Sequence, residues 1–258
     1  MSRARTAEPS NAPVVWHDLE CGSYRADLEL WRKLADHAAP PGKPCSVLDL
    51  GCGTGRVSLD LAAHGNRVTG LEVDPVIAAE LRRRALERKV PAGVAVADAR
   101  AFDLGRRFDL VLAAMQFLQL MRQEDRGSVL RCARAHLRQQ GLFAAALLDL
   151  SGESTDGDYV PPLPDMRELD GWIWSSQAVE VRLLDGGAAL ALGRHRRAVS
   201  PSGEIAESDD SVRLELLGCD QFEQELCAAG ITPVARKPIP PTEDHVGSVV
   251  VLGKVLDG

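Results

Sequence analysis

A glycine-rich segment at residues 49–55, Asp-Leu-Gly-Cys-Gly-Thr-Gly, constrains the fold of this chain more than any other feature. It ends a short apolar run at residues 46–50 that is typical of a buried strand, and a helical pattern follows it over residues 56–64. Glycine lets the backbone turn sharply and lets a ligand approach the main chain closely. The helix behind such a turn offers unpaired N–H groups. The segment therefore predicts a ligand-binding turn between a strand and a helix.

Strand and helix patterns alternate along the first 150 residues. The expected strands cover residues 46–50, 68–73, 94–97, 109–113 and 142–148, and the expected helices cover about 19–39, 56–64, 75–88 and 124–138. Such alternation predicts right-handed crossovers and a parallel sheet with helices on both faces. The fold class is therefore α/β and doubly wound.

The pattern changes after residue 150. A loop rich in glycine, proline and serine is followed by three extended segments, 172–184, 187–199 and 204–216, which predict an antiparallel meander. A helix over 220–229 and strands near 232–237 and 247–255 complete the chain. We expect a disordered tail at 1–14, a core formed by 15–150 and 217–258 with an N-terminal helical segment, and a β-rich lid inserted at 151–216.

Three acidic residues stand at the first three expected strands. Glu72 ends the second strand, 21 residues after Gly51, where a carboxylate can accept both hydroxyls of a ribose. Asp98 follows the third strand and can accept from an adenine amino group, whereas Asp49 lies inside the first strand and needs a cationic or N–H partner. Each acid alone is equally typical of a solvated loop or a helix cap. Together they predict a nucleoside that carries an amino-acid tail.

Residues 47–112 resemble the class I S-adenosylmethionine-dependent methyltransferases. The segment 49–55 is similar to the family's first motif, Glu72 to its ribose-binding acid, and Asp98-Ala99 to its adenine-contacting position. The resemblance covers about 15–150 and 218–256, and it implies a Rossmann-like sheet of seven mostly parallel strands with a reversed last strand. It implies S-adenosylmethionine as cofactor and S-adenosylhomocysteine as product. The cofactor-binding residues that it implies are Tyr24, Asp49, Gly51, Cys52, Gly53, Glu72, Val73, Asp98, Ala99 and Met115.

Other ligands and roles stay open at this point. The dinucleotide fingerprint requires Gly-x-Gly-x-x-Gly, but Arg56 occupies the place of its last glycine, which disfavours a nicotinamide oxidoreductase. A protein that binds S-adenosylmethionine without transferring the methyl group is one alternative. A methyltransferase that acts on RNA or protein is another.

The acceptor is less constrained than the cofactor. The sequence Ala-Met-Gln-Phe at 114–117 replaces the Pro-Pro-Tyr motif of enzymes that methylate exocyclic amines of DNA bases, so we expect N- or O-methylation of a small molecule. The order of elements resembles the glycine and sugar N-methyltransferases. The acceptor-side candidates are Trp16, Gln116, Trp172 and Arg182, and the general-base candidates are His17 and His245, because imidazole titrates near neutral pH. The alternatives are packing of the N-terminal helix for Trp16, packing within the lid for Trp172, and a surface or loop position for His17 and His245.

Composition excludes several classes of protein. The net charge of the 258 residues is −7 and aromatic residues make up 4%, so neither a nucleic-acid partner nor an anionic membrane is expected. The six cysteines contain no Cys-x-x-Cys pair, which argues against a metal site and for a reducing, cytoplasmic location. The first residues lack the apolar stretch of a secretory signal. Because a meander leaves an unpaired edge, a homodimer could form through the lid.

Overall fold

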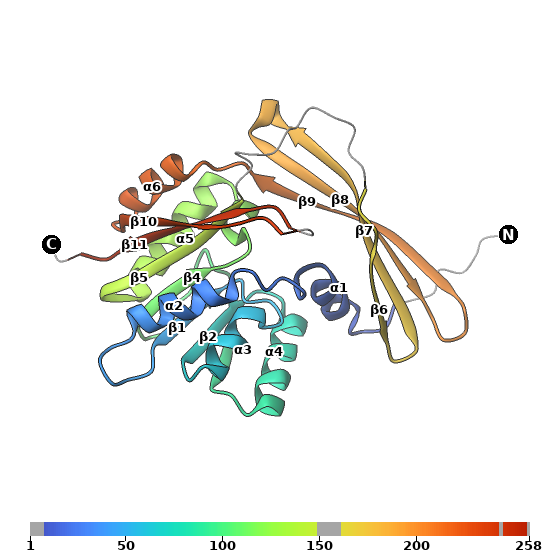
Figure 1. Ribbon diagram of the computed structural model, residues 1–258, viewed down its shortest axis with the longest axis horizontal. Helices are drawn as coiled ribbons and strands as arrows, with labels where there is room; N and C mark the ends of the chain where they lie inside the picture. Colours follow the sequence, from blue (N-terminus) through green and yellow to red (C-terminus); the bar gives the residue numbers. More distant parts are fainter. Residues whose placement is uncertain (1–7, 149–160, 243–244, 257–258) are drawn as a thin grey trace. The chain divides into compact units, whose positions relative to one another are not determined.

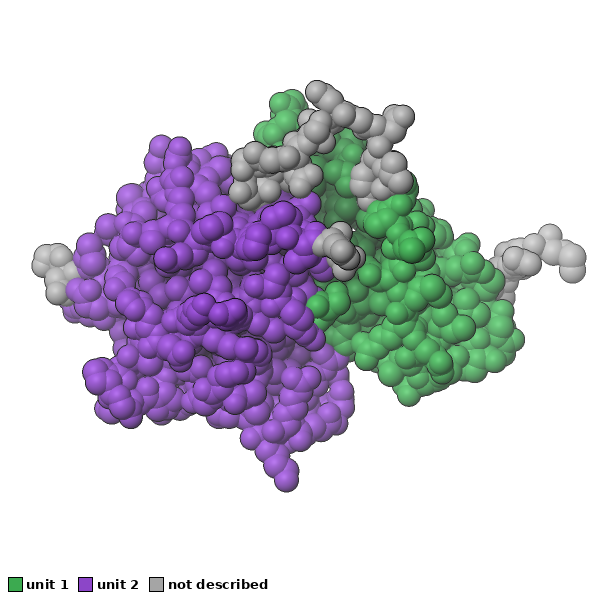
Figure 2. All heavy atoms as spheres, viewed as in Figure 1, with its two compact units in different colours: residues 1–23, 153–216 green, residues 24–152, 217–258 purple. Residues whose placement is uncertain are grey.

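The computed structural model describes residues 8–148, 161–242 and 245–256. The chain divides into two compact units (Figure 2). Unit 1 consists of residues 1–23 and 153–216, and unit 2 of residues 24–152 and 217–258. The chain thus passes from one unit to the other three times.

A seven-stranded sheet forms the centre of unit 2, with the order β10-β11-β5-β4-β1-β2-β3 (Figure 1). Its strands are β1 (Ser46–Leu50), β2 (Arg67–Glu72), β3 (Ala92–Val96), β4 (Phe108–Ala113), β5 (Leu137–Leu148), β10 (Thr232–Ile239) and β11 (Ser248–Lys254). The first five pair in parallel, and β11 pairs antiparallel with both β5 and β10. The predicted doubly wound class and the reversed last strand are confirmed.

Helices cover both faces of this sheet because strand side chains alternate between them. Val47 packs with Trp31 and Leu61 on one face, whereas Leu48 packs with Val129 and Phe222 on the other. The helices of unit 2 are α2 (Leu28–Ala38), α3 (Arg56–Ala63), α4 (Pro75–Arg88), α5 (Gln123–His136) and α6 (Cys219–Ala228), with a short 3₁₀ helix η1 (Phe117–Leu120). The same alternation directs Asp49 toward the face of α2 and α3.

Unit 1 is a four-stranded antiparallel sheet, β6-β7-β8-β9, with helix α1 (Ala12–Cys21) packed on it. Its strands are β6 (Asp165–Leu169), β7 (Trp172–Leu184), β8 (Ala189–Val199) and β9 (Ile205–Glu215), and the short helix η2 (Asp185–Gly187) joins β7 to β8. The predicted meander is confirmed, and β6 adds a strand that the sequence pattern did not indicate.

The N-terminal region differs from the expectation in three ways. The single helix expected over residues 19–39 is two helices, because the chain leaves unit 1 after α1 and enters unit 2 before α2. Residues 12–14 are helical rather than disordered, since a proline in the first turn of α1 favours a helix start. Helix α1 belongs to the unit of the four-stranded sheet and not to the core, because Val15 and Trp16 are buried against Trp174. The expected tail at 1–7 and most of the expected loop at 151–164 lie outside the described residues.

Over the described ranges, no helix combines the length and the apolar character that crossing a membrane requires.

Candidate functional site

The glycine-rich turn connects β1 to α3 at the carboxyl end of the parallel strands. Gly51, Gly53 and Gly55 all have left-handed backbones, with φ of 64°, 55° and 97°. A Cβ atom at Gly51 would lie 2.2 Å from a ring carbon of Phe117, so a side chain does not fit there. The N–H groups of Gly51 and Cys52 both donate to the carbonyl oxygen of Leu71, at 2.9 and 3.1 Å. The turn is therefore fixed to the end of β2.

Glu72 is the last residue of β2, and main-chain donors fix its carboxylate. Oε2 accepts from the N–H of Gly53 at 3.0 Å, and Oε1 accepts from the N–H groups of Val73 and Asp74 at 2.9 and 3.0 Å. Asp74 in turn caps α4 by accepting from the N–H groups of Val76 and Ile77. The carboxylate thus bridges the glycine turn and the start of α4 in one orientation.

Asp49 carries a carboxyl group that is buried in unit 2 with a relative exposure of 2%. Its donor among the described residues is the hydroxyl of Ser58 on α3, at 2.6 Å. Burial raises the pKa of Asp49 to about 7, because one hydroxyl and the nearby Arg56 only partly replace the lost water. A cation or an additional N–H donor would therefore stabilise the ionised form.

Asp98 follows β3 and is tied to Arg100. The guanidinium donates to its oxygens at 2.6 and 3.0 Å, and the main-chain N–H of Arg100 donates at 2.9 Å. These hydrogen bonds lower the pKa of Asp98 to about 2. The side chain keeps a relative exposure of 40%, and the neighbouring Ala99 is buried in the core. Asp98 is an ionised, solvent-accessible acceptor.

Three apolar candidates lie around this edge of the sheet. The thiol of Cys52 is buried against Gly70, where an added Cβ would lie 2.4 Å from Sγ. Burial raises the pKa of this thiol well above its ordinary value, so it is not a nucleophile at neutral pH. Val73 has a relative exposure of 65%, and Met115, just after β4, has a left-handed backbone with φ of 46°.

A second group of polar residues comes from three separate segments of unit 2. The Tyr24 ring lies 4.7 Å from the His245 ring, centroid to centroid. The Tyr24 hydroxyl is buried without a hydrogen-bond partner among the described residues, and burial raises its pKa. The Ser248 hydroxyl, at the start of β11, lies beside it and accepts from Nε2 of Gln116 at 3.1 Å. Gln116 has a left-handed backbone, with φ of 56°, which is strained for a non-glycine residue.

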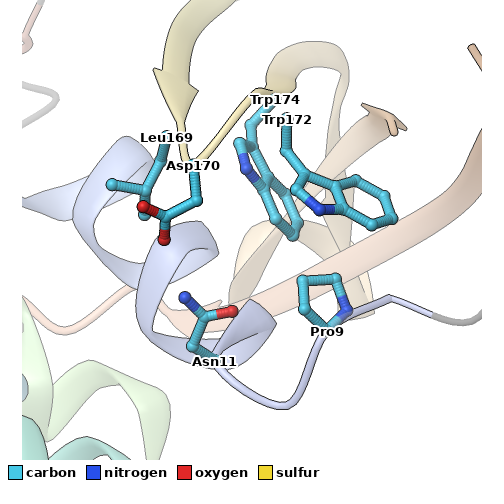
Figure 3. A pocket seen from close by; sticks show the side chains of 6 residues that line it. All are labelled: Pro9, Asn11, Leu169, Asp170, Trp172 and Trp174. Atoms are coloured by element: carbon cyan, nitrogen blue, oxygen red, sulfur yellow. The ribbon is translucent and has the colours of Figure 1, made fainter. Parts of the chain in front are cut away.

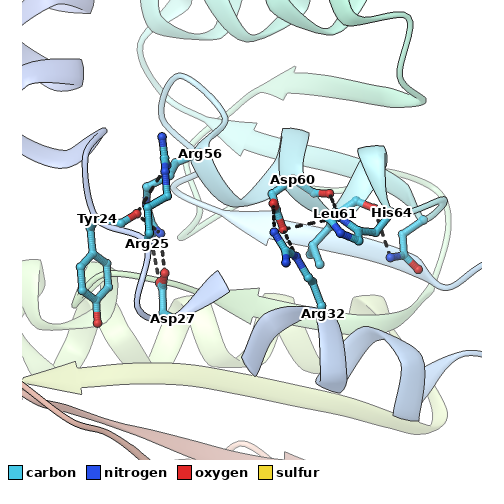
Figure 4. Close-up of polar contacts among 9 residues, drawn as sticks. Tyr24, Arg25, Asp27, Arg32, Arg56, Asp60, Leu61 and His64 are labelled. Atoms are coloured by element: carbon cyan, nitrogen blue, oxygen red, sulfur yellow. Dashed lines mark hydrogen bonds and ion pairs between the residues drawn. The ribbon is translucent and has the colours of Figure 1, made fainter. Parts of the chain in front are cut away.

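A buried ion pair lies next to Tyr24 (Figure 4). The guanidinium of Arg56 binds both carboxylate oxygens of Asp27, at 2.5 and 2.7 Å, and donates to the carbonyl oxygen of Tyr24 at 3.1 Å. It also lies over the Tyr24 ring, 5.2 Å from the centroid. Sequence reasoning missed the roles of Asp27, Arg56 and Ser248, because nothing in one sequence shows that residues so far apart are in contact.

The remaining candidates belong to unit 1. Trp16 on α1 is buried, and its ring meets the Trp174 ring edge-on at 4.8 Å. Its indole N–H donates to Glu8 at 3.1 Å. His17 on the same helix is half-buried, and Arg182 on β7 is exposed, with Nε 3.2 Å from Glu180. The structure therefore groups Tyr24, Gln116 and His245 in unit 2 and places the other acceptor-side candidates in unit 1.

Trp172 borders a cavity of about 60 Å³ in unit 1 (Figure 3). Its lining residues are Pro9, Asn11, Leu169, Asp170, Trp172 and Trp174. The indole N–H of Trp174 is buried there without a hydrogen-bond partner among the described residues. The cavity is several times smaller than a typical small-molecule site of about 300–1,000 Å³.

The known proteins that this chain resembles are methyltransferases. Residues 47–141 match the family model described as a methyltransferase domain. The 2-ketoarginine methyltransferase of Streptomyces arginensis is 32% identical over 140 residues, which are 50% of this chain and 39% of that protein. The dTDP-3-amino-3,6-dideoxy-alpha-D-glucopyranose N,N-dimethyltransferase of Streptomyces fradiae is 27% identical over 194 residues, or 74% of this chain and 71% of that protein.

A solved structure shows the same fold over the whole chain. The sugar N-methyltransferase KedS8 from Streptoalloteichus superposes with a TM-score of 0.75 and 22% identity, covering 100% of this chain and 99% of that one. The matched residues 47–141 thus form a methyltransferase domain, and the strand order agrees with the fold of this similar structure. The chain spans well under half the length of the 2-ketoarginine enzyme that it matches.

Proposed function

We propose that this protein transfers a methyl group from S-adenosylmethionine to nitrogen or oxygen of a small-molecule acceptor. The observation that carries the proposal is the buried carboxyl of Asp49, which has one hydroxyl donor beside a glycine turn that Glu72 braces. A buried carboxyl that lacks donors costs stability unless a ligand supplies them. The ammonium of an amino-acid tail supplies both charge and N–H groups, directly or through water.

The residues around the turn fit the rest of this ligand. Gly51 and Gly53 let the ligand approach the main chain, and the fixed carboxylate of Glu72 is a preorganised acceptor for ribose hydroxyls. Asp98 would share its oxygens between Arg100 and the adenine amino group. Ala99, Val73, Cys52 and Met115 would provide apolar contacts. S-adenosylmethionine supplies a methyl group on a sulfonium, which is ready for in-line displacement, so the protein mainly orients the two partners.

Tyr24, Gln116 and His245 would face the acceptor. The buried Tyr24 hydroxyl and the Gln116 side chain offer hydrogen bonds that can orient a nucleophile, and the His245 imidazole can take up its proton. His17 is the second candidate for the base. Trp16, Trp172 and Arg182 stay predictions for acceptor contacts; of these, Arg182 is the most exposed.

We extend the proposal to the organisation of the protein. The four-stranded sheet of unit 1 acts as the lid that selects the acceptor, and its edge strands β6 and β9 provide a homodimer contact. The location is cytoplasmic, in keeping with six cysteines that form no disulfide. The small-molecule acceptor is supported by the relatives, whose names describe methylation of a keto acid and of an amino sugar nucleotide.

Two measurements test this function. Differential scanning fluorimetry should show stabilisation by S-adenosylhomocysteine and none by NAD; stabilisation by NAD alone would contradict the cofactor assignment. Labelled S-adenosylmethionine incubated with a small-molecule extract should then give a methylated product that can be identified. Cofactor binding without any transfer would favour a non-catalytic role, and salt-dependent binding of tRNA would favour an RNA substrate.

A further inference from the structure

Four groups that can carry charge face the Asp49 carboxyl from the surrounding elements. Arg56 begins α3, Asp27 precedes α2, Glu72 ends β2, and the Cys52 thiol lies in the glycine turn. Arg56 favours the ionised carboxyl, whereas Asp27 and Glu72 disfavour it, and the thiol of Cys52 is neutral at working pH because burial raises its pKa. The charge state of Asp49 therefore depends first on burial, which opposes ionisation, then on the Ser58 hydrogen bond, and then on neighbours of opposite sign.

Arg56 and Asp27 are held together more firmly than a surface pair (Figure 4). Their side chains have relative exposures of 7% and 1%, and the contact is bidentate. Asp27 also accepts from the indole N–H of Trp31 at 2.8 Å. Because Arg56 binds the Tyr24 carbonyl oxygen as well, the pair ties the start of α3 to the segment that carries Tyr24. Neither side chain can turn away without leaving the other buried and unpaired.

We propose that Arg56 and Asp27 are positioning residues of the cofactor site, whose ion pair holds the segment of Tyr24 against the start of α3, the helix that carries the Ser58 donor of Asp49. Arg56 keeps Asp49 able to bind the ammonium of S-adenosylmethionine, and Asp27 holds Arg56 while partly cancelling its charge. This inference rests on the proposed function, because it assigns the ammonium of the cofactor to Asp49.

The inference predicts how cofactor affinity depends on pH. Asp49 has a pKa of about 7 in the free protein, and the ligand ammonium binds the ionised form. Affinity should therefore rise as the pH increases toward 7 and become constant above it. Removing the positive charge of Arg56 moves this rise to higher pH, whereas removing the negative charge of Asp27 moves it to lower pH. If the pair had only a structural role, loss of Arg56 and loss of Asp27 would shift the curve of affinity against pH by the same amount, or neither would shift it.

The experiment is isothermal titration calorimetry of S-adenosylhomocysteine binding between pH 5.5 and 8.5. For Arg56→Gln we expect the midpoint of the affinity curve to move up by roughly one pH unit or more, and for Asp27→Asn to move down by a similar amount. The double variant should return close to the wild-type midpoint, because the two effects cancel. Arg56→Lys keeps the charge, so its midpoint should stay near that of the wild type even though the loss of the bidentate contact weakens binding.

The matched control is Arg32→Gln. Arg32 on α2 binds Asp60 on α3 at 2.5 and 2.8 Å, so it joins the same two helices, but it does not contribute to the pKa shift of Asp49 (Figure 4). The Arg32→Gln variant should therefore have the same midpoint of affinity against pH as the wild type. Midpoints that move in the same direction in Arg56→Gln and Asp27→Asn would overturn the inference. If Arg56→Gln does not fold, Asp27→Asn and the double variant test the inference. The inference alone predicts that Asp27→Asn lowers the midpoint and that adding Arg56→Gln raises it again. A wild-type protein that binds no S-adenosylhomocysteine at any pH would instead contradict the proposed function.

Discussion

Glu20 in unit 1 and Asp49 in unit 2 are both largely withdrawn from solvent, with exposed fractions of 11% and 2%, and they differ in the hydrogen-bond donors that the protein gives them. In unit 1, Glu20 accepts from the guanidinium of Arg196 at 2.7 Å on each oxygen and from the Ser176 hydroxyl at 2.8 Å. Burial acts to raise the pKa of Glu20, but these hydrogen bonds together outweigh it, so the pKa is lowered. In unit 2, Asp49 has the Ser58 hydroxyl, and its pKa is raised to about 7.

The difference separates a structural group from a binding group. A buried carboxylate that protein donors fully satisfy stabilises the fold around it and has little to offer a ligand. A buried carboxylate that has too few donors destabilises the free protein, and a ligand that supplies the missing donors removes this cost. Glu20 therefore holds α1 to the sheet of unit 1, and Asp49 is the group that we propose to bind a ligand.

The largest expected effect concerns the carboxylate that braces the glycine turn. Glu72→Ala should weaken binding of S-adenosylhomocysteine at least tenfold, because two charge-assisted hydrogen bonds to ribose, each worth about 1.5–3 kcal/mol, are lost. Calorimetry measures this, with Glu80→Ala as control, since Glu80 pairs with Arg83 and Arg84 of its own helix, α4. Unchanged affinity in Glu72→Ala would remove Glu72 from the ribose role.

Glu20 and Asp49 should respond to neutral substitution with opposite signs. Glu20→Gln should lower the melting temperature by several degrees, because Arg196 loses its bidentate carboxylate and keeps Asp210 at 3.1 Å. Asp49→Asn should raise the melting temperature of the free protein at pH 8. The folded-state pKa of Asp49, about 7, lies above its ordinary value of 3.8, so stability is lost as the pH rises from about 3.8 to 7, and the full loss is present at pH 8.

The pH dependence tests the sign of the Asp49 effect. The difference in melting temperature between Asp49→Asn and the wild type should shrink as the pH falls below 7, because the wild-type carboxyl then takes up a proton. Scanning fluorimetry at pH 5.5 and pH 8 gives the comparison. An Asp49→Asn protein that is less stable than the wild type at pH 8 would show that the carboxylate is structural, as Glu20 is.

A smaller effect is expected at the acceptor end of unit 2. Ser248→Ala should lower kcat several-fold while cofactor affinity stays constant, because the hydroxyl holds the Gln116 side chain beside Tyr24. Steady-state kinetics with the identified acceptor separates kcat from cofactor binding. A loss of cofactor affinity with unchanged kcat would place Ser248 on the cofactor side instead.

The smallest effect is expected on the surface of unit 1. Arg182→Ala should change the free energy of unfolding by less than about 0.5 kcal/mol, because the side chain is exposed and pairs loosely with Glu180. Its acceptor KM should rise if the predicted acceptor contact exists. An unchanged KM would leave Arg182 as a solvated residue of the sheet.

The core of the fold was predictable because its signals are local. The glycine turn, the apolar strands before it and Glu72 lie within one short stretch, and their spacing alone indicates how the strand ends meet. The break between α1 and α2 was not predictable, since apolar residues continue at helical spacing while the chain passes from one unit to the other.

Long-range contacts limit how much of the candidate site can be predicted from the sequence. Arg56 seemed to be only the residue that breaks a dinucleotide fingerprint, but it forms a buried pair with Asp27, 29 positions away. Ser248 and Gln116 are 132 positions apart, and no periodicity relates them. The contact of Trp16 with Trp174 also joins residues far apart in the sequence, and its role toward the acceptor stays a prediction.

The most direct test of the account is a crystal structure of the protein with S-adenosylhomocysteine. We expect the ribose hydroxyls on the carboxylate of Glu72 and the amino group of the ligand within reach of Asp49, directly or through one water molecule. A ligand bound elsewhere, or one bound at the glycine turn while Asp49 keeps Ser58 as its only donor, would contradict the assignment of the buried carboxyl as the binding group.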